Sequence, residues 1–232
     1  SRNSLMYAAV HDSLVNYKKG KYDDIIQDAI DGIEDESLRT SVENVLDGAT
    51  VNDLVNLLNF IKPKNIVLIG LSIGGLYAAM SLLKGVKAKG LVLINTLRKP
   101  NERLNWINNA MANAVKFGGT SLILDMVMPM IASPKFLSTM KSNALKYENY
   151  LGLDDYNGVS KLMHGGFTTN WDFDWSKLDL PVLVLTGHFD KVFRIEDDIN
   201  NLIKNMKNVK RIEVPECGHL IPIEDPELFS YH

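Results

Sequence analysis

The sequence predicts an α/β fold with a mostly parallel sheet, helices on both faces and an inserted helical segment. Short apolar runs rich in β-branched residues occur at 66–69, 91–95 and 180–187, the pattern of strands buried on both faces, and a fourth run at 209–214 is expected to be the last strand. A helical pattern separates the first run from the second, and the third from the fourth. Between the second and third runs this alternation stops, and residues 99–174 show helical patterns alone.

The segment before the first strand is mainly helical. Residues 1–48 carry apolar residues at roughly helical spacing and contain no convincing strand. A clearer helix is expected at 51–61, with Thr50 as its N-cap and Pro63 ending it. The place of residues 1–48 in the fold is therefore unclear from the sequence.

The first strand leads directly into the pentapeptide Gly70-Leu71-Ser72-Ile73-Gly74, and a helix rich in Ala, Leu and Met follows. This Gly-x-Ser-x-Gly pattern between a strand and a helix is a nucleophile elbow, which holds serine in a strained turn. Side chains at Gly70 and Gly74 are expected to collide with the neighbouring strand and helix. The free N–H of Ile73 would point at an oxyanion formed beside Ser72.

The glycine-rich turn fits neither of two phosphate-binding motifs. Ser72 occupies the middle glycine position of G-x-G-x-x-G, and no Lys-Ser or Lys-Thr pair follows Gly75. The sequence also contains no His, Cys or Asp cluster with metal-ligand spacing. We therefore expect chemistry that needs neither a cofactor nor a metal.

Partners for Ser72 follow the third and fourth strands. Asp190 comes just after the run at 180–187, and His219 after the run at 209–214. Carboxyl ends of parallel strands share one edge of a sheet, so the three side chains can converge there. A neutral imidazole can take the serine proton, and a carboxylate behind it fixes the tautomer. Taken alone, Asp190 would be interpreted as a turn aspartate, and its position just after a strand is what favours the catalytic role.

Other polar residues near these strand ends are weaker candidates for the catalytic acid, base or nucleophile. Asn95 ends its strand at the same edge, but an amide cannot serve as the carboxylate. Cys217 lies close to His219 and is expected to be a packed thiol rather than a second nucleophile. The remaining histidines lack a comparable position: His11, His164, His188 and His232.

Residues 99–174 are expected to form an inserted helical cap, with helices at 104–117, 121–131, 134–151 and 158–163. Six of the nine methionines lie in this segment. We interpret them as an adaptable hydrophobic core, and the alternative is that some line an apolar substrate pocket. The candidate pocket residues are Leu71, Trp106, Met128, Phe136 and His164.

Together these motifs give residues 51–229 a resemblance to α/β-hydrolases of the small esterase and lactonase type. The matching segments are Gly70–Gly75, Pro181–Asp190, Gly218-His219 and Pro226-Glu227. The order serine, acid, histidine and the insertion after Asn95 also match this family. The resemblance implies Ser72 as nucleophile, His219 as base and Asp190 as acid. It also implies a core formed by 1–98 and 175–232.

The chain departs from that family before the elbow. Strands that normally precede it, and the loop that supplies a second oxyanion N–H, are not apparent in residues 1–65. The strand at 66–69 would then be a bare apolar edge, which soluble proteins avoid. Either helices from residues 1–48 cover this edge, or the given chain lacks segments of the natural protein, which we favour. The second oxyanion donor is unassigned.

The composition and net charge of the chain argue against some classes of binding partner. A net charge of −3 gives no electrostatic case for nucleic acid or an anionic membrane, and no uninterrupted apolar run has bilayer-spanning length. The single cysteine excludes an intrachain disulfide and fits a reducing compartment. We expect a cytoplasmic protein whose partner is a small molecule, and a homo-oligomer is left open.

The resemblance implies a serine hydrolase that cleaves a small carboxylic ester or lactone through an acyl-enzyme on Ser72. Carbon–carbon bond hydrolysis and acyl transfer use the same triad and stay open as alternatives. A non-catalytic, ligand-binding protein with this fold is the alternative outside enzymes.

Overall fold

The structure is a computed structural model that describes residues 51–154, 157–160 and 171–231. The helices and strands are α4 (Val51–Ile61), β1 (Val67–Leu71), α5 (Ile73–Leu83), β2 (Gly90–Ile94), α6 (Glu102–Ile131), α7 (Pro134–Met140), η1 (Tyr147–Asn149), η2 (Trp175–Lys177), β3 (Val182–Gly187), α9 (Glu196–Lys204), β4 (Val209–Val214), α10 (Ile221–Glu224) and α11 (Pro226–Tyr231). The expected helices within residues 1–48, the Thr50 cap and His164 lie outside the described residues.

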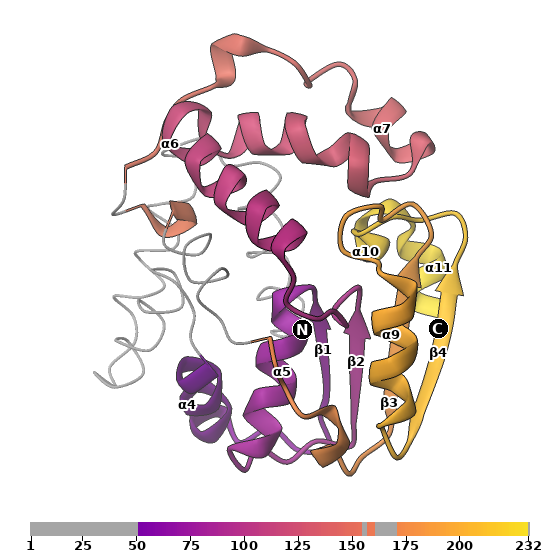
Figure 1. Cartoon of the computed structure of the whole chain (residues 1–232). Coiled ribbons are helices and arrows are strands. Elements are labelled where there is room, and N and C mark those ends of the chain that lie inside the picture. Colours follow the sequence, from indigo (N-terminus) through magenta and orange to yellow (C-terminus); the bar gives the residue numbers. More distant parts are fainter. Residues whose placement is uncertain (1–50, 155–156, 161–170, 232) are drawn as a thin grey trace.

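The described strands form a parallel sheet in the order β1-β2-β3-β4. Each coincides with one of the predicted strands, with ends shifted by up to two residues. All carboxyl ends lie at one edge, the upper edge in Figure 1. The predicted α/β fold is thereby confirmed, and its strand ends bring distant parts of the chain to one place.

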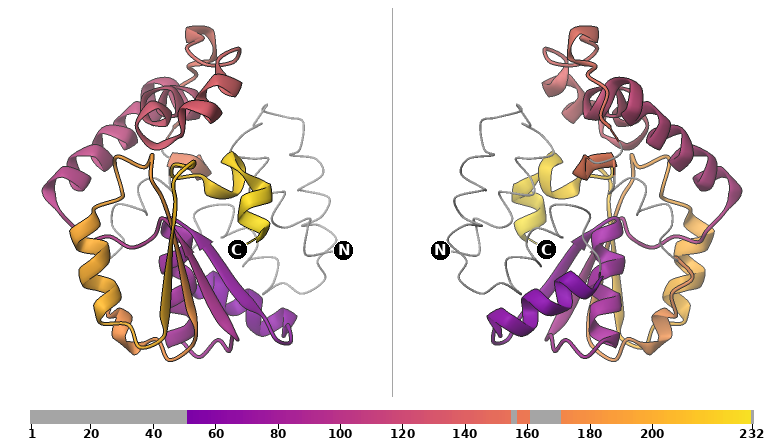
Figure 2. Two further views of the ribbon diagram at one scale, coloured as in Figure 1. Left: turned by 90° about the vertical axis from the view of Figure 1, so that its right-hand side faces the viewer. Right: turned by 90° about the vertical axis from the view of Figure 1, so that its left-hand side faces the viewer.

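Helices cover both faces of the sheet, and residues of each strand alternate between the two sides. Leu93 and Val184 face one side and pack in a cluster with Leu76 of α5 and Ile199 of α9. Their neighbours Ile94 and Leu185 face the other side and pack with Val214, Cys217 and Ile221. Figure 2 shows α9 on one side of the sheet and α10 and α11 on the other. This explains why the runs of β2 and β3, which contribute to both clusters, are so strongly apolar.

Among the described strands, β1 lies at the edge of the sheet, and its side chains are half exposed. Val67 is 52% and Ile69 50% accessible to solvent. Among the described residues, β1 pairs only with β2, and no strand lies on its other side. The expectation of missing strands therefore stays a prediction.

Helices α6 and α7 lie above the carboxyl edge of the sheet (Figure 1). The predicted helices 104–117 and 121–131 appear as the single element α6, bent at Gly119, which has φ 59°. This agrees with a glycine break between them. The division into core and cap at residues 99–174 stays a prediction.

The expected helix over 134–151 is wrong, because α7 ends at Met140. Two hydrogen bonds pull the following chain back onto α6: the Asp125 carboxylate accepts from the Leu145 N–H and from the Tyr150 hydroxyl, both at 2.8 Å. Leu145 also has φ 58°, which interrupts any helix. A tertiary contact therefore overrides the local pattern.

The sequence contains no uninterrupted apolar run of bilayer-spanning length, but the long helix α6 raises the question again. By length and composition alone, α6 could span a bilayer. However, it is kinked at Gly119, and its residues Val115, Ile123 and Val127 pack with Val192 in an internal cluster. This is the packing of a core helix.

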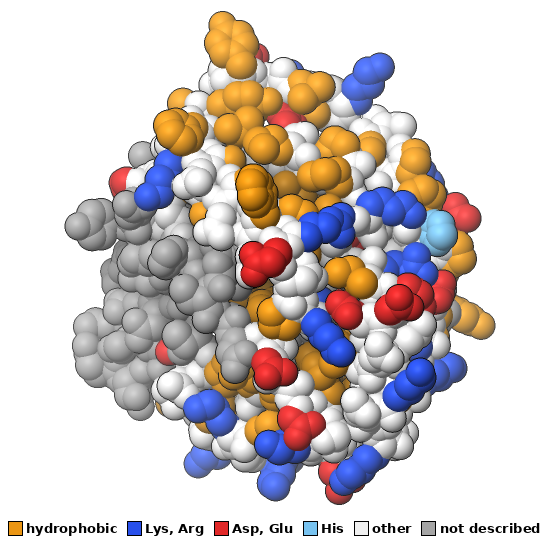
Figure 3. Space-filling view, in the orientation of Figure 1, with side chains coloured by type: hydrophobic (Ala, Val, Ile, Leu, Met, Phe, Trp, Pro, Cys, Tyr) orange, Lys and Arg blue, Asp and Glu red, His pale blue; other side chains and the backbone are white. Residues whose placement is uncertain are grey.

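Exposed apolar side chains gather over this upper, helical part of the molecule (Figure 3). They include Trp106, Phe117, Tyr147 and Leu151.

The turn between β1 and α5 corrects one expectation about its glycines. A Cβ added to Gly70 would overlap the backbone of Gly75, as expected, but one added to Gly74 meets no atom within 4 Å. The second crowded position is Gly75, where a Cβ would overlap the side chain of Thr96. Close packing of α5 on the end of β2 therefore depends on Gly75 and not on Gly74.

We expect Gly74→Ala and Gly75→Ala to change stability in opposite directions. Overpacking against Thr96 should cost about 2 kcal/mol in Gly75→Ala. Replacing a helical glycine by alanine in open space should stabilise Gly74→Ala by about 0.5–1 kcal/mol. Urea unfolding of both variants measures this, and an equal loss in the two would contradict the packing argument.

Candidate active site

Ser72 sits in a strained backbone conformation between β1 and α5. Its φ of 54° and ψ of −122° are unusual for a residue with a side chain. Its N–H donates to the carbonyl oxygen of Ile94 at 2.8 Å, which holds the turn against the end of β2. Ile73 begins α5, so its N–H has no acceptor within the helix. The serine hydroxyl and an amide able to bind an anion are thus adjacent.

Asp190 and His219 form a short hydrogen bond at the same edge of the sheet. His219 Nδ1 lies 2.6 Å from Asp190 Oδ2, and the two residues are only 5% and 1% exposed. Asp190 Oδ1 accepts the amides of Val192 at 3.2 Å and Phe193 at 2.8 Å. The carboxylate is therefore fully engaged and fixes the imidazole ring.

The charge state of Asp190 determines which nitrogen of His219 can act as a base. Burial alone would raise the pKa of Asp190, but the hydrogen bond and charge of His219, the Phe193 amide and the charge of Arg98 together lower it. The carboxylate is therefore ionised at neutral pH and can only accept a hydrogen bond. Nδ1 of His219 must then donate, which leaves Nε2 of the neutral ring as the acceptor.

Ser72 does not complete a chain of hydrogen bonds with His219 in this structure. Among the hydrogen bonds of the described residues, the Ser72 hydroxyl oxygen accepts from Arg98 Nη2 at 2.9 Å, and none joins it to His219. The structure thus brings Asp190 and His219 together as expected. Ser72 is at the same sheet edge, with an unexpected arginine beside it.

The end of α6 holds the loops that carry Asp190 and His219. The carbonyl oxygen of Met130 accepts the Lys191 N–H at 2.9 Å, and that of Ile131 accepts the His219 N–H at 2.6 Å. Carbonyl groups of the last helical turn have no partners within the helix, so these amides satisfy them. The same helix end carries a partial negative charge, which favours a positively charged imidazole nearby.

Asn95 joins three strand ends, a role that the sequence analysis missed. Its Nδ2 donates to the carbonyl oxygens of Gly218 at 3.0 Å and His219 at 2.8 Å, and its Oδ1 accepts from the Gly187 N–H at 2.9 Å. Its φ of 46° is one that asparagine tolerates better than most residues. Sequence reasoning tested Asn95 only as a catalytic acid.

Glu224 is a second residue that sequence reasoning missed. One carboxylate oxygen accepts the N–H groups of Ser133 at 2.8 Å and Gly218 at 2.9 Å, and the other accepts that of Leu220 at 3.1 Å. The side chain therefore ties the His219 loop to the start of α7. A lone acidic residue near the chain end carries no sequence signal for this role.

Arg98 was also missed, although it donates a hydrogen bond to the serine hydroxyl. It is 7% exposed, and Nη2 donates to the Asn95 carbonyl oxygen at 2.8 Å as well as to Ser72. Burial lowers the pKa of Arg98 to about 10, against the opposing effect of the Asp190 charge. The guanidinium is thus still charged at neutral pH.

The predicted pocket residues do not gather at one described cavity. Met128 is buried in the cluster of α6, Phe136 packs against that cluster, and Leu71 packs against the core below the sheet edge. Trp106 is 80% exposed, and His164 lies outside the described residues. Their role in a substrate pocket stays a prediction.

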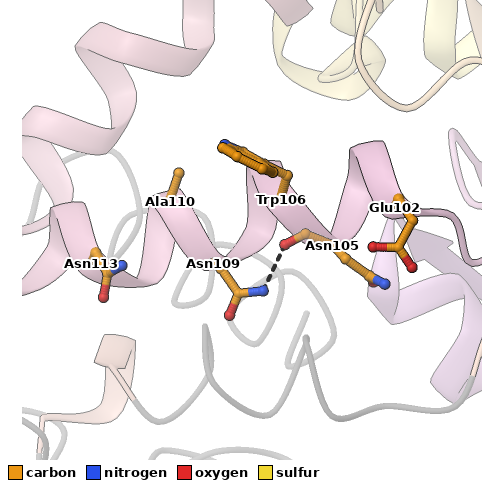
Figure 4. A pocket seen from close by; sticks show the side chains of 6 residues that line it. All are labelled: Glu102, Asn105, Trp106, Asn109, Ala110 and Asn113. Carbon is orange, nitrogen blue, oxygen red and sulfur yellow. Dashed lines mark hydrogen bonds between the residues drawn. The ribbon is translucent and has the colours of Figure 1, made fainter.

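Trp106 instead borders an open hollow of about 370 Å³ along the first half of α6 (Figure 4). The described residues that line it are Glu102, Asn105, Trp106, Asn109, Ala110 and Asn113. Ser72, Asp190 and His219 are not among them, so we do not place the chemistry there.

Two further observations bear on the chemistry of the site. Cys217 is 1% exposed, and burial raises the pKa of its thiol to about 11, which fits a packed, unreactive side chain. Within the described ranges, no group of three His, Cys, Asp or Glu residues is placed to hold a metal ion.

Glu224→Ala should lower the free energy of unfolding by about 2 kcal/mol, because amides of the His219 loop lose their acceptor. Glu227→Ala is the matched control, since Glu227 is exposed in the first turn of α11 and should matter little. Denaturant unfolding of both variants tests this expectation. Equal stability of the two variants would mean that water replaces the carboxylate at no cost.

The comparisons with known proteins agree with this geometry. Residues 32–230 match the model of the alpha/beta hydrolase family. No curated protein matches the chain. A solved thermophilic esterase from Thermogutta terrifontis, with malate bound, is 26% identical, covers 79% of this chain and 70% of its own, and superposes with a TM-score of 0.62.

Other similar structures share the fold at lower identity. MGS-M2, an alpha/beta hydrolase from a Medee basin deep-sea metagenome library, is 21% identical, covers 85% of this chain and 71% of its own, with a TM-score of 0.68. The enol-lactonase of Burkholderia xenovorans LB400 is 18% identical, covers 78% and 68%, with a TM-score of 0.62. The family match spans most of the sequence, and the structure has a parallel sheet with helices on both faces; the chain therefore belongs to the alpha/beta hydrolase family.

Proposed function

We propose that this chain is a serine hydrolase that cleaves a small carboxylic ester or lactone through an acyl-enzyme on Ser72. The observation that carries the proposal is the 2.6 Å hydrogen bond between His219 and an ionised Asp190, at the same sheet edge as the strained Ser72. The similar structures described as an esterase and an enol-lactonase support a reaction at an ester bond. A cytoplasmic location fits the free, buried Cys217.

In the proposed reaction, Nε2 of His219 takes the proton of the Ser72 hydroxyl as its oxygen attacks the acyl carbon. A hydroxyl has one hydrogen to donate and lone pairs to accept, so Ser72 can keep its bond from Arg98 while donating to His219. The Ile73 N–H would bind the oxyanion. His219 then protonates the leaving alcohol, and a water molecule, activated in the same way, releases the acid.

Asp190 stays ionised throughout this cycle. It holds the Nδ1–H tautomer in the resting state and stabilises the imidazolium once Nε2 is protonated. Carbon–carbon bond hydrolysis, acyl transfer and ligand binding without turnover would use the same residues. No separate contact among the described residues favours any of them over ester or lactone cleavage.

The decisive experiment is labelling with a fluorophosphonate, followed by intact-mass measurement. The parent chain and Ser138→Ala, which removes an exposed serine hydroxyl on α7, should each gain a single adduct. Ser72→Ala should gain none, because the activated hydroxyl is gone. An unlabelled but folded parent would refute the hydrolase proposal.

Asp190→Asn should lower kcat on an activated acyl ester by about 10⁴-fold, because the amide no longer fixes the productive tautomer. Asp197→Asn is the control: this residue is exposed on α9, and activity should be unchanged. Loss of the same size in both variants would argue for a general structural defect.

Asp190 should also affect how stability depends on pH. Its pKa is lower in the folded state than in the unfolded chain, so its stabilisation is present above about pH 4 and disappears as pH falls. The stability difference between the parent and Asp190→Asn should therefore shrink in acid. Thermal unfolding across this range measures it, and a difference that grew in acid would contradict the assigned charge.

A further inference from the structure

Arg98 carries a positive charge that is buried beside Ser72 without a salt bridge. Within the described part of the chain, no carboxylate lies within salt-bridge distance of its guanidinium. The negative charge that acts on it is that of Asp190, whose oxygens are already bonded to His219, Val192 and Phe193. A buried charge of this kind is costly to the fold unless something pairs with it.

The guanidinium is held in one position. Nε donates to the Thr96 carbonyl oxygen at 3.3 Å, and Nη2 donates to the Asn95 carbonyl oxygen and to the Ser72 hydroxyl. Its central carbon lies 4.4 Å from the ring centres of both Trp171 and Phe193. Carbonyl groups and aromatic faces stabilise the cation but do not neutralise it.

The hydrogen bonds of this fixed group involve only two of its three nitrogens. The amino group of Nη1 has no hydrogen-bond partner among the described residues, whereas Nε and Nη2 are engaged. The hydrogens of Nη1 can donate to one carboxylate oxygen, and the charge of the fixed guanidinium strengthens such a bond. Because Nη2 contacts the Ser72 oxygen at 2.9 Å, a carboxylate bound to the same guanidinium would lie close to the attacking oxygen, where a carboxylate of the attacked molecule can reach it.

We propose that Arg98 binds a free carboxylate on the acyl part of the substrate, so that the site selects esters or lactones of short dicarboxylic acids. This inference rests on the proposed hydrolase function and deepens it. The acyl chain must be short, of about the length of a succinyl group, because the guanidinium lies directly beside the attacking oxygen. Trp171 and Phe193 would keep water away from the ion pair and so strengthen it.

The test compares two ethyl esters of similar length, monoethyl succinate and ethyl pentanoate, which differ in the terminal carboxylate. The ratio of their kcat/KM values, succinate over pentanoate, should exceed one in the parent. In Arg98→Gln this ratio should fall by about 30-fold or more, because truncating one partner of a buried ion pair leaves the other unpaired. Most of the loss should appear in KM, because the carboxylate is bound before and during the reaction.

Two further variants sharpen the test. Arg98→Lys should give an intermediate ratio, since it keeps the charge but loses the guanidinium that the Thr96 and Asn95 carbonyl oxygens hold in place. Lys99→Gln is the matched control: it removes a positive charge from the next residue, which is exposed. Its ratio should stay within about twofold of the parent, because exposed charges contribute little.

A measurement on the parent alone covers the case in which Arg98 variants do not fold. Succinate should protect Ser72 from the fluorophosphonate at concentrations where pentanoic acid amide, which has no charge, does not. Failure of succinate to protect would overturn the inference.

The outcomes separate this inference from the proposed function. Hydrolysis of ethyl pentanoate with no advantage for monoethyl succinate would overturn the role of Arg98 and leave the hydrolase proposal standing. Equal losses for both esters in Arg98→Gln would show that Arg98 serves the oxyanion or the fold instead, and would also overturn it. A parent that is neither labelled nor active on either ester would refute both.

Discussion

The hydrogen bond from the His219 amide to the Ile131 carbonyl oxygen joins the helical segment to the loop that carries the imidazole. The backbone segments around this bond pack so closely that only glycine fits at two positions. A Cβ on Gly218 would overlap the Ile131 carbonyl, and one on Gly187 would overlap the Gly218 carbonyl. Backbone packs on backbone here, from the end of β3 through the His219 loop to the end of α6. The position of His219 therefore depends on both the sheet and the helices above it.

Side chains complete what this backbone packing begins. Asn95 reaches from β2 to the carbonyl groups of the His219 loop, and Glu224 accepts amides from that loop and from the start of α7. Each bond joins a charged or amide side chain to backbone groups that would otherwise be buried without partners. Loops held in this way can keep an imidazole oriented without any regular structure of their own. The sheet determines where each strand ends, and the side chains of Asn95 and Glu224 hold the loops that follow these ends at fixed distances from one another.

The sequence predicted the parts of this architecture that follow from local patterns. The apolar runs, the elbow at Ser72 and the polar residues after the last two strands are each recognisable within about ten residues of chain. Asn95, Arg98 and Glu224 could not be assigned in this way, because their partners lie elsewhere in the chain or are backbone groups. Of these bonds, the one between Asn95 and His219 spans 124 positions. No periodicity or motif encodes such a contact.

The two errors in local structure have the same origin. The helix expected beyond Met140 loses to Asp125, which draws Leu145 and Tyr150 back onto α6. The crowding expected at Gly74 falls on Gly75 instead, because Thr96 of the neighbouring strand end presses there. In both places a residue distant in sequence decides the outcome, and the local pattern is compatible with either result.

The charges at the sheet edge depend on one another in the same way. Asp190 opposes the effect of burial on Arg98, and Arg98 contributes to keeping Asp190 ionised. Asp190 is nevertheless held by His219 and two backbone amides, so its position does not require the arginine. Arg98, by contrast, is held by carbonyl groups and aromatic rings, none of which carries a negative charge. The His219–Asp190 pair therefore does not depend on Arg98 for its position, and the cation is the part of the site whose charge no carboxylate of the described residues pairs with.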